Sequence, residues 1–127
     1  MIGMSVFGLE EKALSLCEER SSMLARNIAN SDTPNYKSMD INFQEELSKA
    51  HQSNSLKTTH GNHLQGNQAD DGHKLYYRIP NQKNQDGNTV DDEIERKNFI
   101  ENALHYQASL GFAKNRAASL LKAIKGA

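Results

Sequence analysis

The sequence predicts a mainly α-helical chain: two long terminal helices form a coiled-coil-like pair, joined by a poorly structured middle segment with at most a short β element. Two observations predict this: apolar residues recur at helical spacing near both ends, and a polar stretch separates them. We divide the 127 residues into 1–36, an N-terminal helix with a motif after it, 37–88, a loop or extended segment, and 89–127, a C-terminal heptad helix. All three parts belong to one structural unit.

The N-terminal helix is expected from about Ser5 to Ile28. One side of it is apolar, and Pro34 ends it because proline removes a backbone donor and disfavours helix in the preceding residue. Arg20 falls inside the apolar arc, where it either forms a buried ion pair with another subunit or extends its charge to water. The predicted packing residues on this helix are Leu9, Ala13, Leu16 and Met23.

The middle segment is dominated by Asn, Gln, Ser, Thr, His and Gly between His51 and Gln68. Such a composition buries too little apolar surface to offset the ordering of the chain, which predicts a loop or disorder. Leu75 to Ile79 is the exception and is a candidate short strand or docking segment. Asp86-Gly87 is a tight-turn signal that precedes the last helix.

The C-terminal helix is predicted to start at a capping box of Thr89 and Asp92 and to stop at Gly126. Two rows of residues spaced by seven interleave along it without a charge, as in a coiled-coil seam. Small side chains in this seam let a partner helix approach closely, which favours helix-to-helix packing over an amphipathic helix on an ordinary core. The seam residues are Phe99, Ala103, Tyr106, Leu110, Ala113, Ala117, Leu120 and Ile124.

Composition limits what the chain can do. Hydrophobic residues make up 36%, tryptophan is absent and the net charge is −1, so we expect no large core, no nucleic-acid partner and no direct membrane insertion. Two helices alone leave apolar arcs uncovered, so we expect neighbouring subunits to cover them and the free monomer to be partly disordered. The N-terminus does not resemble a cleaved signal peptide, so a protein acting outside the cytoplasm needs another export route.

No residue set predicts a reaction centre, a cofactor or a metal. His60 and His63, near His51 and His73, lack the four-ligand set that zinc needs. Cys17 lies at the apolar edge of a helix, where a small hydrophobic residue is the common case. No Gly-rich phosphate loop and no serine elbow occurs. The chain is therefore predicted not to be an enzyme.

The motif after the first helix carries a family resemblance. It contains Asn-Ile-Ala-Asn, then Thr-Pro, then Tyr-Lys, and it resembles the N-terminal signature of flagellar axial proteins. Residues 40–43 and the blocks 86–91, 95–96 and 101–108 are similar to rod proteins of the FlgB, or proximal rod, type. The signature residues are Asn27, Ile28, Ala29, Asn30, Asp32, Thr33, Pro34, Tyr36 and Lys37.

The resemblance implies a structural subunit of the proximal rod of the flagellar basal body. Relatives leave the cytoplasm through the flagellar type III export apparatus without a cleaved signal and pack their terminal helices into a tube that transmits torque. The implied partners are copies of the chain, other rod subunits, and basal-body base and export-gate proteins. The alternative is a soluble helical adaptor or export-associated coiled-coil protein, which stops at a fixed stoichiometry where a rod subunit assembles without limit.

Overall fold

The computed structural model describes residues 8–55, 74–80 and 84–126. The elements are helix α1 (Gly8–Ala29), strand β1 (Met39–Ile41), helix α2 (Phe43–Ser55), strand β2 (Leu75–Tyr77) and helix α3 (Asp92–Lys125). The mainly helical fold class is confirmed, with a long C-terminal helix and a single two-stranded sheet within the described ranges.

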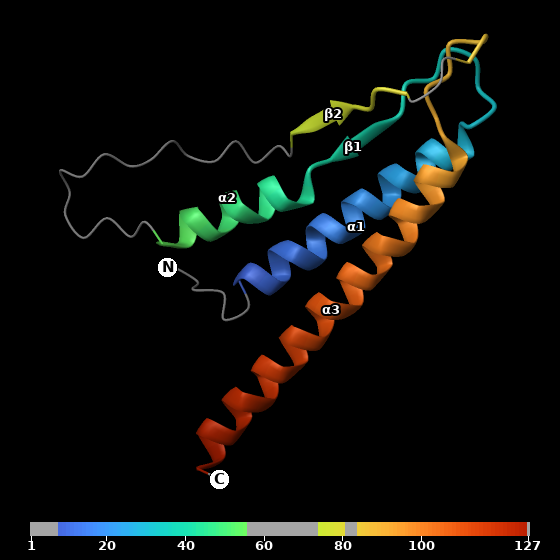
Figure 1. The fold of residues 1–127 in the computed structure, drawn as a ribbon. Helices are drawn as coiled ribbons and strands as arrows, with labels where there is room; N and C mark the ends of the chain where they lie inside the picture. The colour runs from blue at the N-terminus through green and yellow to red at the C-terminus, as the bar shows by residue number, and fades with distance from the viewer. Residues whose placement is uncertain (1–7, 56–73, 81–83, 127) are drawn as a thin grey trace, which may run out of the picture.

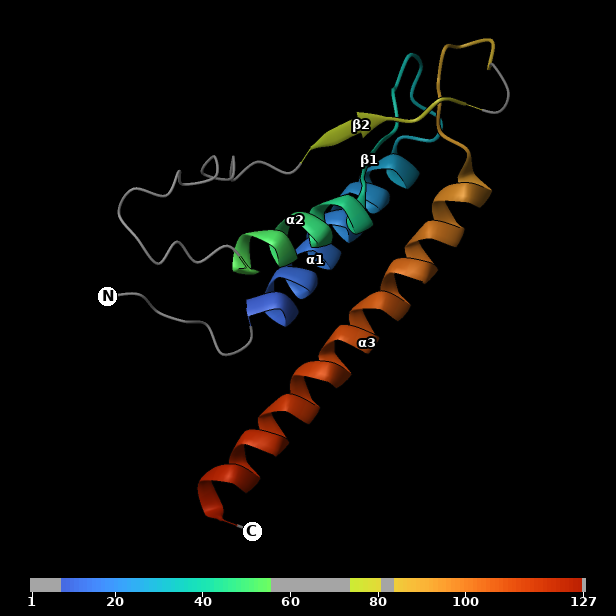
Figure 2. The ribbon, with the colours of Figure 1, turned by 60° about the vertical axis from the view of Figure 1, so that its left-hand side comes forward.

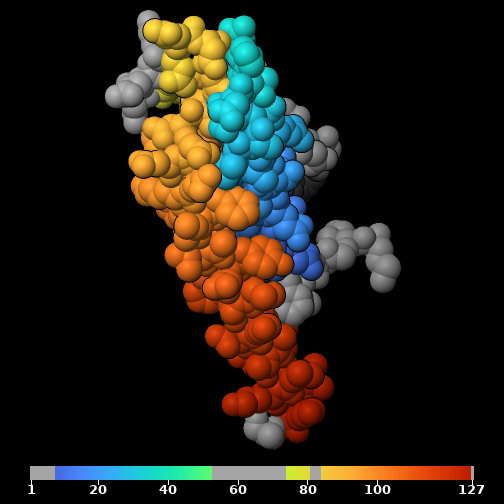
Figure 3. Space-filling model, turned by 90° about the vertical axis from the view of Figure 1, so that its right-hand side faces the viewer, coloured from blue at the N-terminus to red at the C-terminus, as the bar shows by residue number. Residues whose placement is uncertain are grey.

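Helices α1 and α3 run antiparallel, because α3 begins beside the end of α1 and returns along it (Figures 1 and 2). The sheet and α2 lie along another side of α1, which contacts α2, β1 and α3 and is the central element. The C-terminal half of α3 projects beyond the start of α1, as the space-filling view in Figure 3 shows. The contact of α3 with α1 reaches as far as Arg116, which bonds Glu10 at the start of α1.

The sheet is an antiparallel pair in which Met39 lies opposite Tyr77 and Ile41 opposite Leu75. This confirms the predicted short strand in the segment from Leu75 to Ile79. All three residues of β2 are exposed, whereas Asp40 and Ile41 of β1 are buried. β1 thus lies between β2 and α1, and β2 is the outer strand.

Helix α2 falls within the segment that was predicted as loop or extended chain, so that prediction is wrong for Phe43–Ser55. Its N-cap is Asn42, whose side-chain Oδ1 accepts a hydrogen bond from the backbone N–H of Glu45 at 3.3 Å. Asn42 followed by Glu45 is a capping pattern that the sequence does contain. The ring of Phe43, in the first turn, stacks on His105 of α3 with centroids 5.3 Å apart. A local cap, the packing of α2 against α1 and the contact of Phe43 with α3 therefore support a helix in this polar segment.

The C-terminal end of α3 agrees with the prediction, and its N-terminal end does not. Gly126 adopts a left-handed φ of 67° and its N–H bonds the carbonyl of Lys122, which confirms the predicted stop. The start was predicted wrongly: the N-cap is Asp91, whose carboxylate accepts from the N–H groups of Glu93 and Ile94. Thr89 does not cap the helix, because its hydroxyl bonds the backbone of Ser38 instead.

The core is small, and more of its described side chains are polar than apolar. The buried apolar residues lie mostly on α1 and are Ala13, Leu16, Cys17, Leu24, Ile41 and Val90. The buried polar residues come from every described element except β2 and are Asn27, Ser38, Asp40, Glu46, Asn88, Glu95 and Asn102. Buried polar groups are costly unless they are paired, so their partners decide how this chain is held together.

Candidate functional site

The motif after α1 is organised around Asn27, which is fully buried. Its amide nitrogen donates to the carbonyl of Met39 at 2.8 Å and to Oε2 of Glu95 at 3.1 Å. Its amide oxygen accepts from the hydroxyl of Tyr36 at 3.2 Å and from the backbone N–H of Met39 at 3.3 Å. One side chain of the motif therefore joins the end of α1 to β1 and to the first turn of α3.

The turn that follows is held by side chains of the motif itself. The amide of Asn30 donates to the carbonyl of Arg26 at 2.8 Å, inside the last turn of α1. The hydroxyl of Thr33 then donates to Oδ1 of Asn30 at 3.1 Å. Asparagine side chains commonly bond nearby backbone groups in this way at the ends of helices.

The segment before α3 docks onto this turn through Asn88, which is 2% exposed. Its amide nitrogen lies within 2.9 Å of the carbonyls of Asn30, Ser31 and Thr33. Further along, the backbone N–H of Thr89 donates to the carbonyl of Tyr36 at 3.0 Å. The two blocks that carry the family resemblance are thus in direct contact although more than fifty residues separate them.

The backbone at this contact needs two left-handed residues. Asn35 has φ 61° and Gly87 has φ 76°, and the N–H of Asn35 donates to the carbonyl of Asp86 at 2.9 Å. A Cβ on Gly87 would lie 2.5 Å from Oδ1 of Asn35. The ammonium of Lys37 donates to the carbonyl of Gly87 at 2.8 Å. The predicted tight turn at Asp86-Gly87 is confirmed, and its glycine is required by both φ and close approach.

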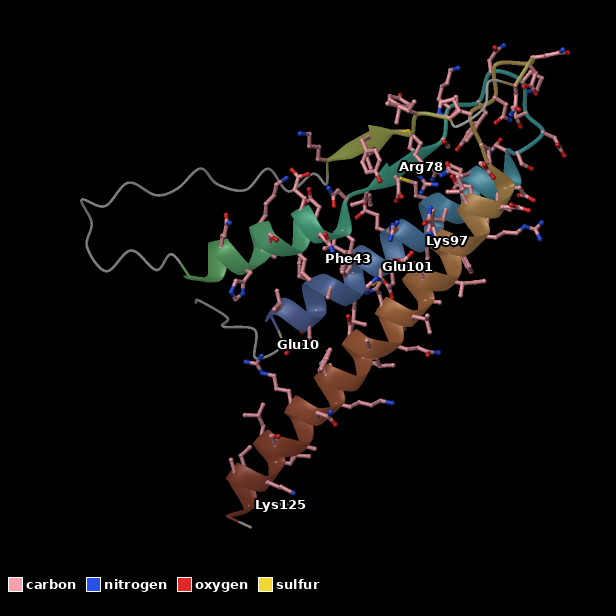
Figure 4. All side chains as sticks on the ribbon, viewed as in Figure 1. Glu10, Phe43, Arg78, Lys97, Glu101 and Lys125 are labelled. Atoms are coloured by element: carbon pink, nitrogen blue, oxygen red, sulfur yellow. The ribbon has the colours of Figure 1, made fainter. Side chains whose placement is uncertain are left out.

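Beside Asn27, four charged side chains from α1, β1, α3 and the segment after β2 meet: Arg20, Asp40, Arg78 and Glu95. Arg20 donates two hydrogen bonds to Asp40, from Nε to Oδ1 at 2.9 Å and from Nη2 to Oδ2 at 3.1 Å. Arg78, labelled in Figure 4, follows β2 and pairs with both Asp40 and Glu95. Both carboxylates are 1% exposed. Two positive and two negative charges therefore neutralise one another inside the fold.

The two carboxylates titrate differently. Burial by itself raises the pKa of Asp40, but the hydrogen bonds from Arg20 and Arg78 outweigh it and bring the pKa below its ordinary value. Burial also raises the pKa of Glu95, and the hydrogen bond from Asn27 and the charge of Arg78 offset only part of that rise. Asp40 is therefore the more strongly compensated of the two charges.

Arg20 takes neither of the two roles that the sequence suggested. Its partner Asp40 belongs to the same chain, so the ion pair is not one between subunits, and its side chain is only 13% exposed, so it does not extend into water. The correction follows from β1, which brings Asp40 against the apolar side of α1. No local sequence pattern could show that contact, because twenty residues separate the two side chains.

We call this region the junction: residues 27–40, Arg20, Arg78 and residues 84–95. The motif residues differ in how deeply they are buried in the junction. Asn27 is buried, and Ile28, Asn30 and Tyr36 are half-buried. The exposed motif residues are Ala29, Asp32, Thr33, Pro34 and Lys37. Arg78, Asn88 and Glu95 were not among the predicted site residues, although the last two lie in the blocks 86–91 and 95–96 that carry the resemblance.

The predicted seam residues lie along the α1–α3 contact in part. On α1, Ala13 and Leu16 are buried while Leu9 and Met23 are half-buried. On α3, the half-buried members are Tyr106, Leu110, Ala113 and Ala117, and the exposed ones are Phe99, Ala103, Leu120 and Ile124. In the first half of α3 the contact face is taken by Glu95 and Asn102 instead. A straight helix drifts by about 20° per heptad, which moves the contact from that polar row to the predicted seam.

Neither a metal site nor a membrane span emerges from the described parts of the chain. Within them no group of three or more His, Cys, Asp or Glu side chains is placed to hold a metal ion. Of the histidines considered above, His51 is exposed, and His60, His63 and His73 lie outside the described residues. No described helix is both long and apolar enough to cross a bilayer.

The chain is similar along nearly its whole length to curated flagellar proteins. It is 45% identical to a protein of Aeromonas hydrophila, with 94% of this chain and 92% of that protein covered. It is 43% identical to a protein of Buchnera aphidicola, with 95% of each covered, and 36% identical to a protein of Escherichia coli K12, with 91% and 90% covered. Each is named flagellar basal body rod protein FlgB. No protein-family model matches the chain.

The junction holds the two terminal helices as a pair and offers no reaction centre among the described residues. With these relatives, that fold identifies a structural subunit of the bacterial flagellum, one that belongs to the basal-body rod. More particularly, the chain belongs to the FlgB family of flagellar basal body rod proteins.

Proposed function

We propose that this subunit forms the proximal part of the rod, where its terminal helices pack against copies of itself and other rod subunits in a helical tube that transmits torque. It meets the base of the basal body and the export gate at its other contacts, and it is exported without a cleaved signal. In this role it supplies packing surfaces and no catalytic group. The family membership supports the rod, and the surface of α3 supports the packing.

The observation that carries the proposal is the amount of apolar side chain left uncovered on α3. Leu104 is 62% exposed, Phe112 is 65% exposed and Ile124 is 81% exposed. These values greatly exceed what burial against α1 would leave, and exposed apolar surface of this kind is typical of protein–protein contacts. Ile100, Leu104, Ala108 and Gly111 also recur at helical spacing on the side opposite Asn102. A neighbouring helix can therefore pack there.

A charged substitution in this exposed row tests the proposal. Leu104→Asp should abolish rod assembly and motility while the unfolding free energy of the isolated subunit changes by less than about 0.5 kcal/mol, because the side chain is exposed before assembly. Export of the variant, assayed by secretion, should continue. Gln107→Asp is the matched control, since it adds the same charge at an exposed polar position of α3. Normal rods in Leu104→Asp would refute packing through this row.

A further inference from the structure

The face that α3 turns toward α1 carries a row of polar residues spaced by seven: Glu95, Asn102, Ser109 and Arg116. Glu95 and Asn102 are the fully buried residues of α3. Ser109 is half-buried, and Arg116 is exposed but reaches back toward α1. The most buried positions of α3 are thus polar, while larger apolar side chains of the same helix remain exposed.

Three members of this row have a partner on α1, and the partners follow in antiparallel order. Glu95 accepts from the amide of Asn27 at 3.1 Å. Arg116 donates to Glu10 at 3.1 and 3.3 Å, at the opposite end of α1, where Glu10 is labelled in Figure 4. Between them lies Asn102. The three contacts mark one alignment of the helices along their length.

Asn102 lies at the centre of the contact. Its amide nitrogen donates to the carbonyl of Cys17 at 2.8 Å and to the hydroxyl of Ser21 at 2.7 Å. Its amide oxygen, also buried, has no hydrogen-bond partner in the structure. A buried oxygen without a partner is unfavourable, and a leucine of similar size would avoid that cost. Stability alone therefore does not explain an asparagine at this position.

Apolar contacts are non-directional and would tolerate several alignments of two helices that carry small and apolar residues on several sides. A polar contact is different, because sliding α3 by one heptad would take Asn102 away from Ser21 and Glu95 away from Asn27. A single buried asparagine is known to fix the register of coiled coils in this way. We propose that Asn102, supported by Glu95 and Arg116, sets the axial register of α3 on α1.

The inference rests on the proposed function in one respect, since a fixed register places the exposed apolar residues of α3 at defined heights for neighbouring subunits. Asn102 is then a positioning residue: it acts on assembly through the alignment of the two helices. The register itself is a property of the single chain. It can therefore be measured without any rod, and its failure can be told apart from a failure of assembly.

The test measures a distance between spin labels by pulsed electron paramagnetic resonance on the full-length, unassembled chain. Cys17→Ala removes the native thiol, and Glu18→Cys and Ala108→Cys place labels on exposed positions of α1 and α3. We expect one narrow distance population with Asn102 present. Asn102→Leu should add a second distance population, because a slip of one heptad moves the label on α3 by about 10 Å along the helix axis. Ala103→Leu, which adds the same side chain at the neighbouring exposed position, should leave one population.

A charge exchange provides the second arm and does not depend on whether Asn102→Leu folds. Glu10→Arg or Arg116→Glu alone should broaden the distance distribution, and the two together should restore it, since the pair is re-formed with its charges exchanged. An unchanged single population in a helical Asn102→Leu chain would overturn the proposal. So would the lack of a single population in the labelled parent, or a double exchange that fails to restore the distribution.

Discussion

The side of α3 that faces α1 buries polar side chains against the rest of the subunit, whereas its other sides and its C-terminal end expose apolar ones. In the junction, Glu95 is 1% exposed and is held by Asn27 and Arg78. In the projecting half, Leu121 is 54% exposed and Ile124 is 81% exposed. The usual arrangement of polar outside and apolar inside is reversed along one helix. Directional polar contacts therefore define the subunit, and the exposed apolar surface is what the proposed packing of neighbouring subunits would cover.

The largest expected effect comes from removing Arg78. Arg78→Ala leaves Glu95 without a positive partner and Asp40 with Arg20 alone, so we expect the unfolding free energy to fall by about 3–5 kcal/mol. Urea denaturation followed by circular dichroism measures this. The control is Arg96→Ala, since Arg96 pairs with Asp92 on the exposed surface and should contribute less than about 1 kcal/mol. Equal effects of the two substitutions would remove the energetic distinction between junction and surface.

An intermediate effect, opposite in sign for the two regions, is expected from adding one methyl group to a glycine. Gly87→Ala forces a left-handed φ on alanine in the junction and should cost about 1–2 kcal/mol. Gly111→Ala meets no atom within 4 Å in the middle of α3 and should stabilise the chain by about 0.5–1 kcal/mol. Midpoints of thermal unfolding should therefore move in opposite directions. A shift of the same sign in both variants would contradict the assignment of Gly87 to a strained turn.

The smallest expected effect is a dependence on pH. Glu95 has a raised pKa, so its contribution to stability is present below its ordinary value of 4.5 and is lost as pH rises through the folded value. Asp40 has a lowered pKa, so its contribution is present above 3.8 and is lost as pH falls through its folded value. The unfolding free energy of wild type, relative to that of Glu95→Gln, should therefore rise as the pH falls from 7 to 4.5.

The matching comparison for this pH effect is Asp40→Asn. The advantage of wild type over that variant should hold at pH 4.5 and shrink only as pH falls below 3.8, because the unfolded chain then binds a proton that folded Asp40 does not yet bind. Unfolding free energies from urea titrations at each pH give both differences. Parallel pH trends for the two variants would show that the carboxylates are not compensated differently, contrary to the geometry of the ion cluster.

The sequence by itself determined the two terminal helices, the strand near Leu75, the turn at Asp86-Gly87 and the stop at Gly126. These depend on local periodicity, turn chemistry and caps, which neighbouring residues specify. The sequence also contains the cap of α2, in Asn42 and Glu45. The polar composition of the surrounding segment nevertheless led to the prediction of a loop there. The family resemblance is also determined by the sequence alone, because it depends on the order of residues along the chain.

Only the tertiary structure decided what the polar residues of the helices do. Arg20 bonds Asp40, Asn88 bonds three carbonyls of the turn after α1, and Asn102 lies against Ser21. Each partner is far away in sequence, and a buried charge or amide leaves no periodic trace by which its partner could be found. The heptad of α3 likewise identified a packing face. Which rotation of the helix meets α1 was settled by Glu95 and Asn102, because their hydrogen bonds require that side to be inward.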